Sequence, residues 1–307
     1  MAISQTKPRQ TRSQLYVPGN QPTWFAKGVA TGADALILDL EDAVPIDSKA
    51  SAREEVAAFL ASRAEHPDPV LLVRVNDSGQ REFLDDVIAT VEAGVDGIVL
   101  PKVYGPSDVI ALDGLLGAIE RRCGRMLGST MIVPILETAE AIRGAYEIGV
   151  ASSRVAHMGG MSARGGDIER GVGFRWSSAG QETLGLRARA LLDARAAKVP
   201  NPVSGTWTDI EDLDGMRAFA TQSRDLGYEG MVLIHPSHVP IANEVFGPSP
   251  EDLERDRRLI EAMSQAESNG SAAIRFDGHM VDIAMVTRAR ERLARAGDQP
   301  MRADSSS

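Results

Sequence analysis

The chain has 307 residues, of which 43% are hydrophobic, and its formal net charge is −10. This apolar fraction supports a large folded core and argues against global disorder. The acidic balance, without a long basic run, argues against nucleic acid or an anionic membrane as a partner. No stretch reaches 18 apolar residues and the N-terminus lacks the apolar core of a signal peptide, so we expect a cytoplasmic protein with no membrane partner.

Eight short apolar runs recur along the chain, and most are followed by turn residues and a helical pattern such as residues 49–63 or 81–93. The runs cover residues 14–18, 35–40, 70–75, 97–103, 131–136, 154–158, 203–207 and 230–234. Such runs are typical of strands that are buried on both faces in a parallel sheet. Eight strands alternating with helices predict a (β/α)₈ TIM barrel, an α/β fold. The seventh run is poorly marked, so an open doubly wound sheet remains the alternative.

The ends of the chain do not follow the repeat. Residues 1–12 predict a flexible N-terminal arm, and residues 13–248 predict the barrel. Residues 249–296 predict a C-terminal helical arm or lid, with helices over 250–267 and 280–296 and a short apolar run at 272–276. Residues 297–307 predict a disordered tail.

The fifth run, Met-Ile-Val-Pro-Ile-Leu over residues 131–136, leads directly into Glu137. An acidic residue at the C-terminal end of a strand lies where an α/β barrel places its chemistry. Pro134 counts against a central strand because it removes one backbone donor. Alternatively, Glu137 caps a helix that begins near Ala139.

Polar residues also follow other runs, and in a barrel they would gather at one mouth. They are Asp39, Glu41, Asp42, Arg74, Asn76, Lys102, Glu137, Asp167 and His235. Two carboxylates in oxygen-rich surroundings suit Mg²⁺, which keeps several water ligands. The single cysteine, Cys123, and the absence of paired His spacing argue against zinc.

An ordered set of motifs resembles the citrate lyase β-subunit and malyl-CoA lyase family, within the HpcH/HpaI aldolase superfamily. The motifs are residues 12–19 (RSQLYVPG), 38–44 (LDLEDAV), 74–76 (RVN), 101–102 (PK), 137–138 (ET), 234–236 (IHP) and 278–282 (GHMVD). The resemblance covers residues 12–296. It implies a modified barrel, a Mg²⁺ (or Mn²⁺) cofactor and carbon–carbon lyase activity on a CoA thioester.

The resemblance implies that the enzyme cleaves or forms a 3-hydroxyacyl-CoA of the malyl-CoA or citramalyl-CoA type. The other reactants would be an acyl-CoA and a 2-oxo acid such as glyoxylate, with thioester hydrolysis as an additional step. It also implies a homotrimer or homohexamer. Alternatives are a CoA-independent 2-oxo-acid aldolase, a citrate lyase β-type subunit that acts on an acyl-carrier thioester within a complex, and a subunit that is inactive alone.

By position, the resemblance implies that Glu137 and Asp167 bind the metal and that Arg74 contacts the reacting oxygens. Asp282, from a neighbouring subunit, would be the catalytic acid/base. The implied substrate-binding residues are Tyr16, Lys27, Arg74, Gly166, Asp167, Ile234 and His235.

Each assignment has a structural alternative. Arg74 could form an ion pair with Glu41 or Asp42, and those acids could serve only to hold water or Lys102. His235 could be a packed rim residue, Lys27 a solvated charge, and Asp282 a surface charge.

Two features depart from the family pattern. A long glycine-rich loop, residues 157–166, precedes Asp167, and Gln21 stands where some relatives have an arginine near the CoA phosphates. The absence of an arginine at position 21 predicts weaker binding of CoA.

Overall fold

The computed structural model describes residues 10–63, 69–159, 164–268 and 273–297. Most of the predicted N-terminal arm and nearly all of the predicted C-terminal tail lie outside these residues, as does part of the glycine-rich loop. The chain forms two compact units, Met1–Phe246 and Gly247–Ser307. Among the described residues, no helix has the length and apolarity needed to cross a membrane.

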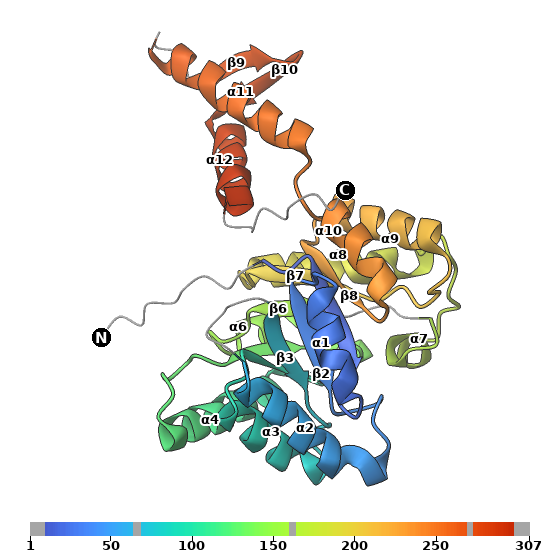
Figure 1. The fold of residues 1–307 in the computed structure, drawn as a ribbon. Helices are drawn as coiled ribbons and strands as arrows, with labels where there is room; N and C mark the ends of the chain where they lie inside the picture. Colours follow the sequence, from blue (N-terminus) through green and yellow to red (C-terminus); the bar gives the residue numbers. More distant parts are fainter. Residues whose placement is uncertain (1–9, 64–68, 160–163, 269–272, 298–307) are drawn as a thin grey trace. The chain divides into compact units, whose positions relative to one another are not determined.

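The first unit is an eight-stranded parallel barrel, as predicted (Figure 1). Its strands are β1 Ser13–Pro18, β2 Ala35–Asp39, β3 Val70–Arg74, β4 Gly97–Leu100, β5 Met131–Pro134, β6 His157–Gly159, β7 Asn201–Ser204 and β8 Gly230–Leu233. They pair in the order β5-β4-β3-β2-β1-β8-β7-β6. The seventh strand begins and ends earlier than the predicted run of residues 203–207.

The ring is not closed by a continuous ladder between β5 and β6. The two strands are connected by isolated bridges, Ile132 with Val155 and Ile135 with Gly159. Pro134 is the last residue of β5, next to this seam. A proline without an N–H is tolerated at such a sheet edge, so Pro134 is compatible with a strand at this position.

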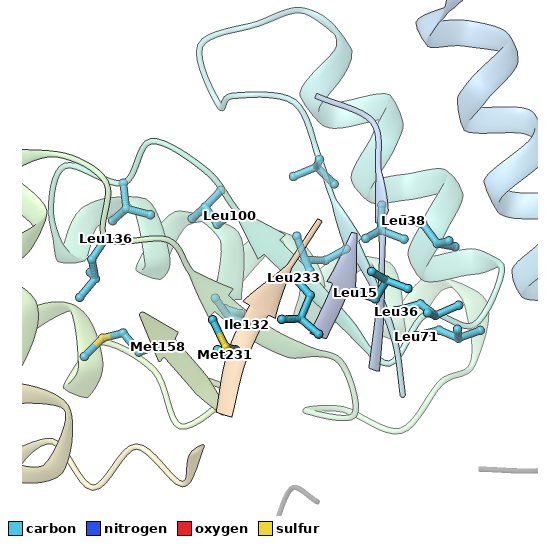
Figure 2. Packing of buried hydrophobic residues seen from close by; sticks show 14 of the residues in the cluster. Leu15, Leu36, Leu38, Leu71, Leu100, Ile132, Leu136, Met158, Met231 and Leu233 are labelled. Atoms are coloured by element: carbon cyan, nitrogen blue, oxygen red, sulfur yellow. The ribbon is translucent and has the colours of Figure 1, made fainter. Parts of the chain in front are cut away.

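Side chains alternate along each strand between two cores. Leu15 and Leu36 belong to the large core between the sheet and the helices (Figure 2), whereas Ile37 and Val133 belong to a smaller core inside the barrel. The same alternation points Gln14 and Tyr16 of β1 inward. The inward side chains nearest the C-terminal ends of the strands can therefore form a site.

Helices cover the outside of the barrel (Figure 1). They are α1 Pro22–Ala30, α2 Lys49–Ala61, α3 Glu82–Glu92, α4 Pro106–Cys123, α5 Ala139–Arg143, α6 Ala145–Val150, α7 Asp167–Val172, α8 Gln181–Ala196, α9 Leu213–Leu226 and α10 Val239–Val245. The helices predicted at residues 49–63 and 81–93 correspond to α2 and α3.

The second unit contains a β-hairpin that the sequence analysis did not predict. Its elements are α11 Pro250–Ser268, β9 Ala273–Phe276, β10 His279–Asp282 and α12 Ile283–Gly297. The prediction of one helix over residues 280–296 was therefore wrong at its start. Asp277 and Gly278 both have positive φ, 46° and 81°, as a two-residue hairpin turn requires.

The second unit has a small core of its own, formed by Leu259, Met263, Val281, Val286 and Ala289. Ile274 and Phe276 pack against it. Met280, Ile283 and Met285 are exposed, Met280 by 75%. The unit thus buries only part of the apolar stripe that its sequence carries.

Candidate active site

A cavity of about 360 Å³ opens at the C-terminal ends of the barrel strands. It brings together most of the predicted site residues: Tyr16, Arg74, Glu137, Gly166, Asp167 and Ile234. Apolar side chains such as Ile37, Val99 and Val232 form much of its wall. This mixture of an apolar wall and a few convergent polar groups is typical of a small-molecule site.

Arg74, the last residue of β3, pairs with Asp39, the last residue of β2. Its Nε and terminal nitrogen donate to the two Asp39 carboxylate oxygens at 2.7 and 2.6 Å. Asp39 is held in turn by the backbone N–H groups of Glu41 and Ala43. Of the two alternative ion pairs considered for Arg74, the one with Glu41 is present at 3.2 Å, and the one with Asp42 is not found.

The Arg74 guanidinium also lies 4.7 Å from the centre of the Tyr16 ring. Burial lowers the pKa of Arg74, but Tyr16, Asp39 and Glu41 outweigh burial and raise the pKa well above its ordinary value. Burial also raises the pKa of the Tyr16 hydroxyl above its ordinary value. Arg74 is therefore a permanent cation, and Tyr16 a neutral hydroxyl, in the cavity wall.

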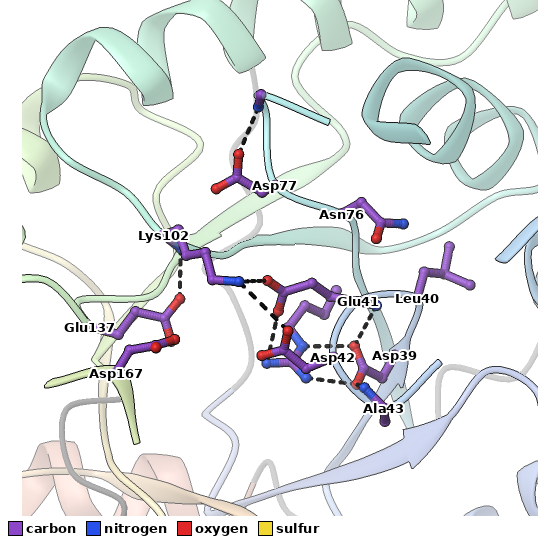
Figure 3. Close-up of polar contacts among 12 residues, drawn as sticks. Asp39, Leu40, Glu41, Asp42, Ala43, Asn76, Asp77, Lys102, Glu137 and Asp167 are labelled. Carbon is purple, nitrogen blue, oxygen red and sulfur yellow. Dashed lines mark hydrogen bonds and ion pairs between the residues drawn. The ribbon is translucent and has the colours of Figure 1, made fainter. Parts of the chain in front are cut away.

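Glu41 accepts a hydrogen bond from the ammonium of Lys102 at 2.7 Å, and Asp42 lies 3.6 Å from the same nitrogen (Figure 3). This confirms the interpretation that the two acids hold Lys102. Glu41 Oε2 has no geometrically ideal hydrogen bond, but Arg74 approaches it to 3.2 Å as an ion pair. Asn76, by contrast, holds Asp86 rather than facing the cavity.

Glu137 has one carboxylate oxygen bound to the backbone N–H of Lys102 at 2.7 Å. It does not cap the following helix, because the side chain of Thr138 accepts from the N–H of Ala141 instead. Burial raises the pKa of Glu137 to about 7, and the charges of Glu41 and Asp167 add to this effect. The carboxyl group is thus poorly compensated by positive charge.

Asp167 begins α7 and forms an ion pair with Arg170 one turn later. Its carboxylate lies beside that of Glu137 (Figure 3). Both carboxylates line the cavity. Arg170 is 82% exposed, so its charge is well screened by water.

These two carboxylates fit a divalent cation of the magnesium type. Glu137 is a buried acid next to further acids, and a bound cation would relieve their repulsion. Within the described residues, no cluster of three or more His, Cys, Asp or Glu residues could hold a metal. Two carboxylates with room for water ligands suit Mg²⁺ or Mn²⁺ rather than zinc.

Three predicted residues lie outside the cavity lining. Lys27 is exposed on α1, and His235 binds Ser237 through its ring Nδ1. Asp282 is exposed in the second unit and accepts hydrogen bonds from the N–H groups of Ala284 and Met285. In its own chain, therefore, Asp282 caps α12.

The cavity also contains residues that the sequence analysis missed. Gln14, Thr206 and Thr208 line it, and the buried amide oxygen of Gln14 has no hydrogen-bond partner among the described residues. The two-residue alternation with Tyr16 could have identified Gln14. Thr206 and Thr208 follow the seventh strand, which ends at Ser204, whereas the predicted run placed Thr206 inside the strand.

A sequence model of the HpcH/HpaI aldolase/citrate lyase family matches residues 12–236. The chain belongs to this family. The chain is 32% identical over 288 residues to a citrate lyase subunit beta of Haemophilus influenzae, covering 93% of this chain and 96% of that protein. It is 35% identical over 288 residues to a (3S)-malyl-CoA thioesterase of Cereibacter sphaeroides, covering 93% and 94%.

An L-malyl-CoA/beta-methylmalyl-CoA lyase of Cereibacter sphaeroides is 34% identical over 300 residues, covering 92% of this chain and 93% of that protein. Among solved structures, the CitE protein of Mycobacterium tuberculosis in complex with magnesium, acetoacetate and coenzyme A matches with a TM-score of 0.72 and 27% identity. This match covers 95% of this chain and 100% of the other. The chain is accordingly an enzyme of the lyase class, and two of these relatives are named for malyl-CoA.

Proposed function

We propose that this lyase cleaves, or in reverse forms, a 3-hydroxyacyl-CoA of the malyl-CoA or citramalyl-CoA type. The products of cleavage are an acyl-CoA and a 2-oxo acid such as glyoxylate. The observation that carries the proposal is the convergence of Tyr16, Arg74, Glu137 and Asp167 on one cavity. The likeness to relatives named for malyl-CoA supports the substrate class.

In this proposal Glu137 and Asp167 hold Mg²⁺ (or Mn²⁺). When bound, the ion supplies Lewis-acid polarisation of the 2-oxo acid carbonyl and offsets the alkoxide charge. The protein contributes two fixed carboxylates, one of them oriented by the backbone of Lys102. It also contributes an apolar wall that limits water at the reacting atoms.

Arg74 is the fixed cation for the thioester half of the reaction. During cleavage the 3-hydroxyl group releases its proton to water and its oxygen becomes the carbonyl of the 2-oxo acid. The carbon–carbon bond breaks, its electrons move onto the thioester carbonyl, and an enolate forms. Asp39 uses two of the five guanidinium N–H groups, so others remain for the enolate oxygen. Because Asp39 holds the guanidinium rigidly, its charge is preorganised where negative charge develops.

Asp282 is the proposed acid/base group, acting in the cavity of a neighbouring subunit of a homotrimer or homohexamer. It would deliver the proton to the enolate α-carbon in cleavage and remove it in synthesis. Exposed apolar side chains flank it, namely Met280 and Ile283, and these would be covered in such an assembly.

A mixing experiment tests this role. Asp282→Asn keeps the helix cap, since Asn caps as well as Asp, so turnover should fall by about two to four decades without loss of stability. Mixed oligomers of Asp282→Asn and Arg74→Ala subunits should regain part of the activity. Asp277→Asn is the matched control, because it removes a charge from the same hairpin and keeps a favourable turn sequence. No recovery despite demonstrated subunit exchange would contradict the role.

Thioester hydrolysis is a second candidate activity, and the likeness to a malyl-CoA thioesterase favours it. Lys27 and Tyr16 are the proposed contacts to the CoA ester, with Gly166, Ile234 and His235 around the 2-oxo acid. Gln21 directly precedes α1 and carries no positive charge, so binding of the CoA phosphates would depend on Lys27.

The whole proposal is tested by assaying purified protein with Mg²⁺, CoA esters and 2-oxo acids, with and without EDTA. Full activity in EDTA would exclude the metal site. Cleavage of a free hydroxy acid, together with no CoA binding by calorimetry, would instead support the CoA-independent aldolase. Activity only with an acyl-carrier thioester and co-purifying large subunits would support a citrate lyase β-type subunit.

A further inference from the structure

Lys102 has an unusual backbone conformation for a lysine. It follows β4 and Pro101, and its φ of 50° lies in the left-handed region that disfavours residues with a Cβ. Among the described residues only Lys198 and Asp277 share this property outside glycine. Strained backbone at a cavity mouth persists only where surrounding contacts hold it.

Two contacts start from this one residue and run in different directions (Figure 3). The backbone N–H of Lys102 donates to Glu137 Oε1 at 2.7 Å. The ammonium donates to Glu41 Oε1 at 2.7 Å, and Glu41 is 2% exposed. The side chain therefore anchors the residue to the segment after β2, while its main chain contacts the segment after β5.

We propose that Lys102 is a positioning residue for Glu137: its left-handed backbone aims the N–H at one carboxylate oxygen and leaves the other for the metal. The pair with Glu41 anchors the strained turn. Because φ sets the angle between the N–H and the side chain of one residue, a right-handed φ would not let the N–H reach Glu137 while the side chain points to Glu41. The Glu137 carboxylate would then be free to change rotamer. This inference rests on the proposed function, because it assigns a purpose to the orientation of a proposed metal ligand.

Three substitutions separate the backbone from the side chain. Lys102→Gly, Lys102→Ala and Lys102→Val all remove the ammonium, so its electrostatic effect is common to them. They differ in how well they tolerate a positive φ, in the order Gly, Ala, Val. Lys198→Val is the matched control, since Lys198 has a φ of 61° and is exposed away from the cavity.

Mn²⁺ binding, measured by calorimetry and electron paramagnetic resonance without substrate, is the readout. We expect Lys102→Gly to bind most tightly of the three and Lys102→Val about 10- to 100-fold more weakly than Lys102→Gly, as for other residues that orient a metal ligand. Lys102→Ala should lie between them, and it preserves the test if the valine variant does not fold. Lys198→Val should match the wild type.

Equal Mn²⁺ affinity in the three Lys102 variants would overturn the inference, as would an equal loss in Lys198→Val. A wild-type protein that binds no Mn²⁺ through Glu137 and Asp167 would overturn the metal site itself, and this inference with it. A graded loss across Gly, Ala and Val supports it, because a purely electrostatic role predicts no grading.

Discussion

The mouth of the barrel contains two pairs of acids with opposite surroundings. Asp39 and Glu41 are neutralised by Arg74 and Lys102 through contacts of 2.6 to 3.2 Å. Among the described residues, Glu137 and Asp167 have only a backbone N–H and an exposed arginine as strong partners. The first pair holds the cationic side chains in position, whereas the second pair has carboxylate oxygens left over for a cation. An acidic residue at a strand end does not by itself indicate a metal ligand. The lack of a nearby positive charge is what favours the second pair for the proposed metal site.

The largest expected effect is a loss of turnover on removing Glu137, an acid that is not paired with a cation. Glu137→Gln should lower metal-dependent turnover by three decades or more, about 4 kcal/mol of transition-state stabilisation. Stability should stay the same or rise, because a buried, poorly paired charge is replaced by a neutral amide. Mn²⁺ binding and thermal melting, measured together, check this. A large loss of melting temperature would mean that Glu137 is structural.

Removing an acid that is paired with a cation should instead lower the stability of the protein. Asp39→Asn leaves the Arg74 guanidinium largely buried with half its counter-charge, at a cost of about 3 kcal/mol of unfolding free energy. Urea denaturation of the metal-free protein measures this. If Asp39→Asn and Glu137→Gln have equal stability, the contrast between the two pairs is wrong.

The pH dependence of stability gives a third comparison. The pKa of Glu137 is raised from its ordinary 4.5 to about 7, so between these values the unfolded chain releases a proton that the folded chain keeps. The metal-free protein should therefore lose stability as pH rises through this window, by at most about 3 kcal/mol. Denaturation at pH 4.5 and 7.5 should show the loss in the wild type and not in Glu137→Gln. Mn²⁺ affinity should rise with pH over the same range.

The smallest effect concerns the exposed partner of Asp167. Arg170→Ala removes a well-solvated ion pair and should change the unfolding free energy by less than about 1 kcal/mol. Mn²⁺ should bind slightly more tightly, since a competing cation is gone. A large loss of unfolding free energy or of Mn²⁺ affinity would show that Arg170 holds Asp167 in place.

The barrel and the positions of its polar strand ends could be predicted from sequence because strand runs and turns are local signals. Residues far apart in sequence could not be paired in the same way: the contact of Arg74 with Asp39 spans 35 residues, and depends on the register of β2 with β3. The seventh strand was misplaced because Asn201 and Pro202 give it a polar, proline-containing start. The hairpin was missed although Asp277-Gly278 is a strong turn signal.

The interrupted ladder between β5 and β6 has a mechanical consequence. Backbone hydrogen bonds cross this seam from Ile132, Leu136 and Ala156, whereas β1 and β2 pair over five consecutive residues. Glu137 follows one side of the seam and Asp167 follows the other. An ion bound by both carboxylates would add a link between the two sides of this seam, which few backbone hydrogen bonds connect. Chelation should then speed amide hydrogen exchange at Leu136 and Ala156 while leaving Leu38 protected.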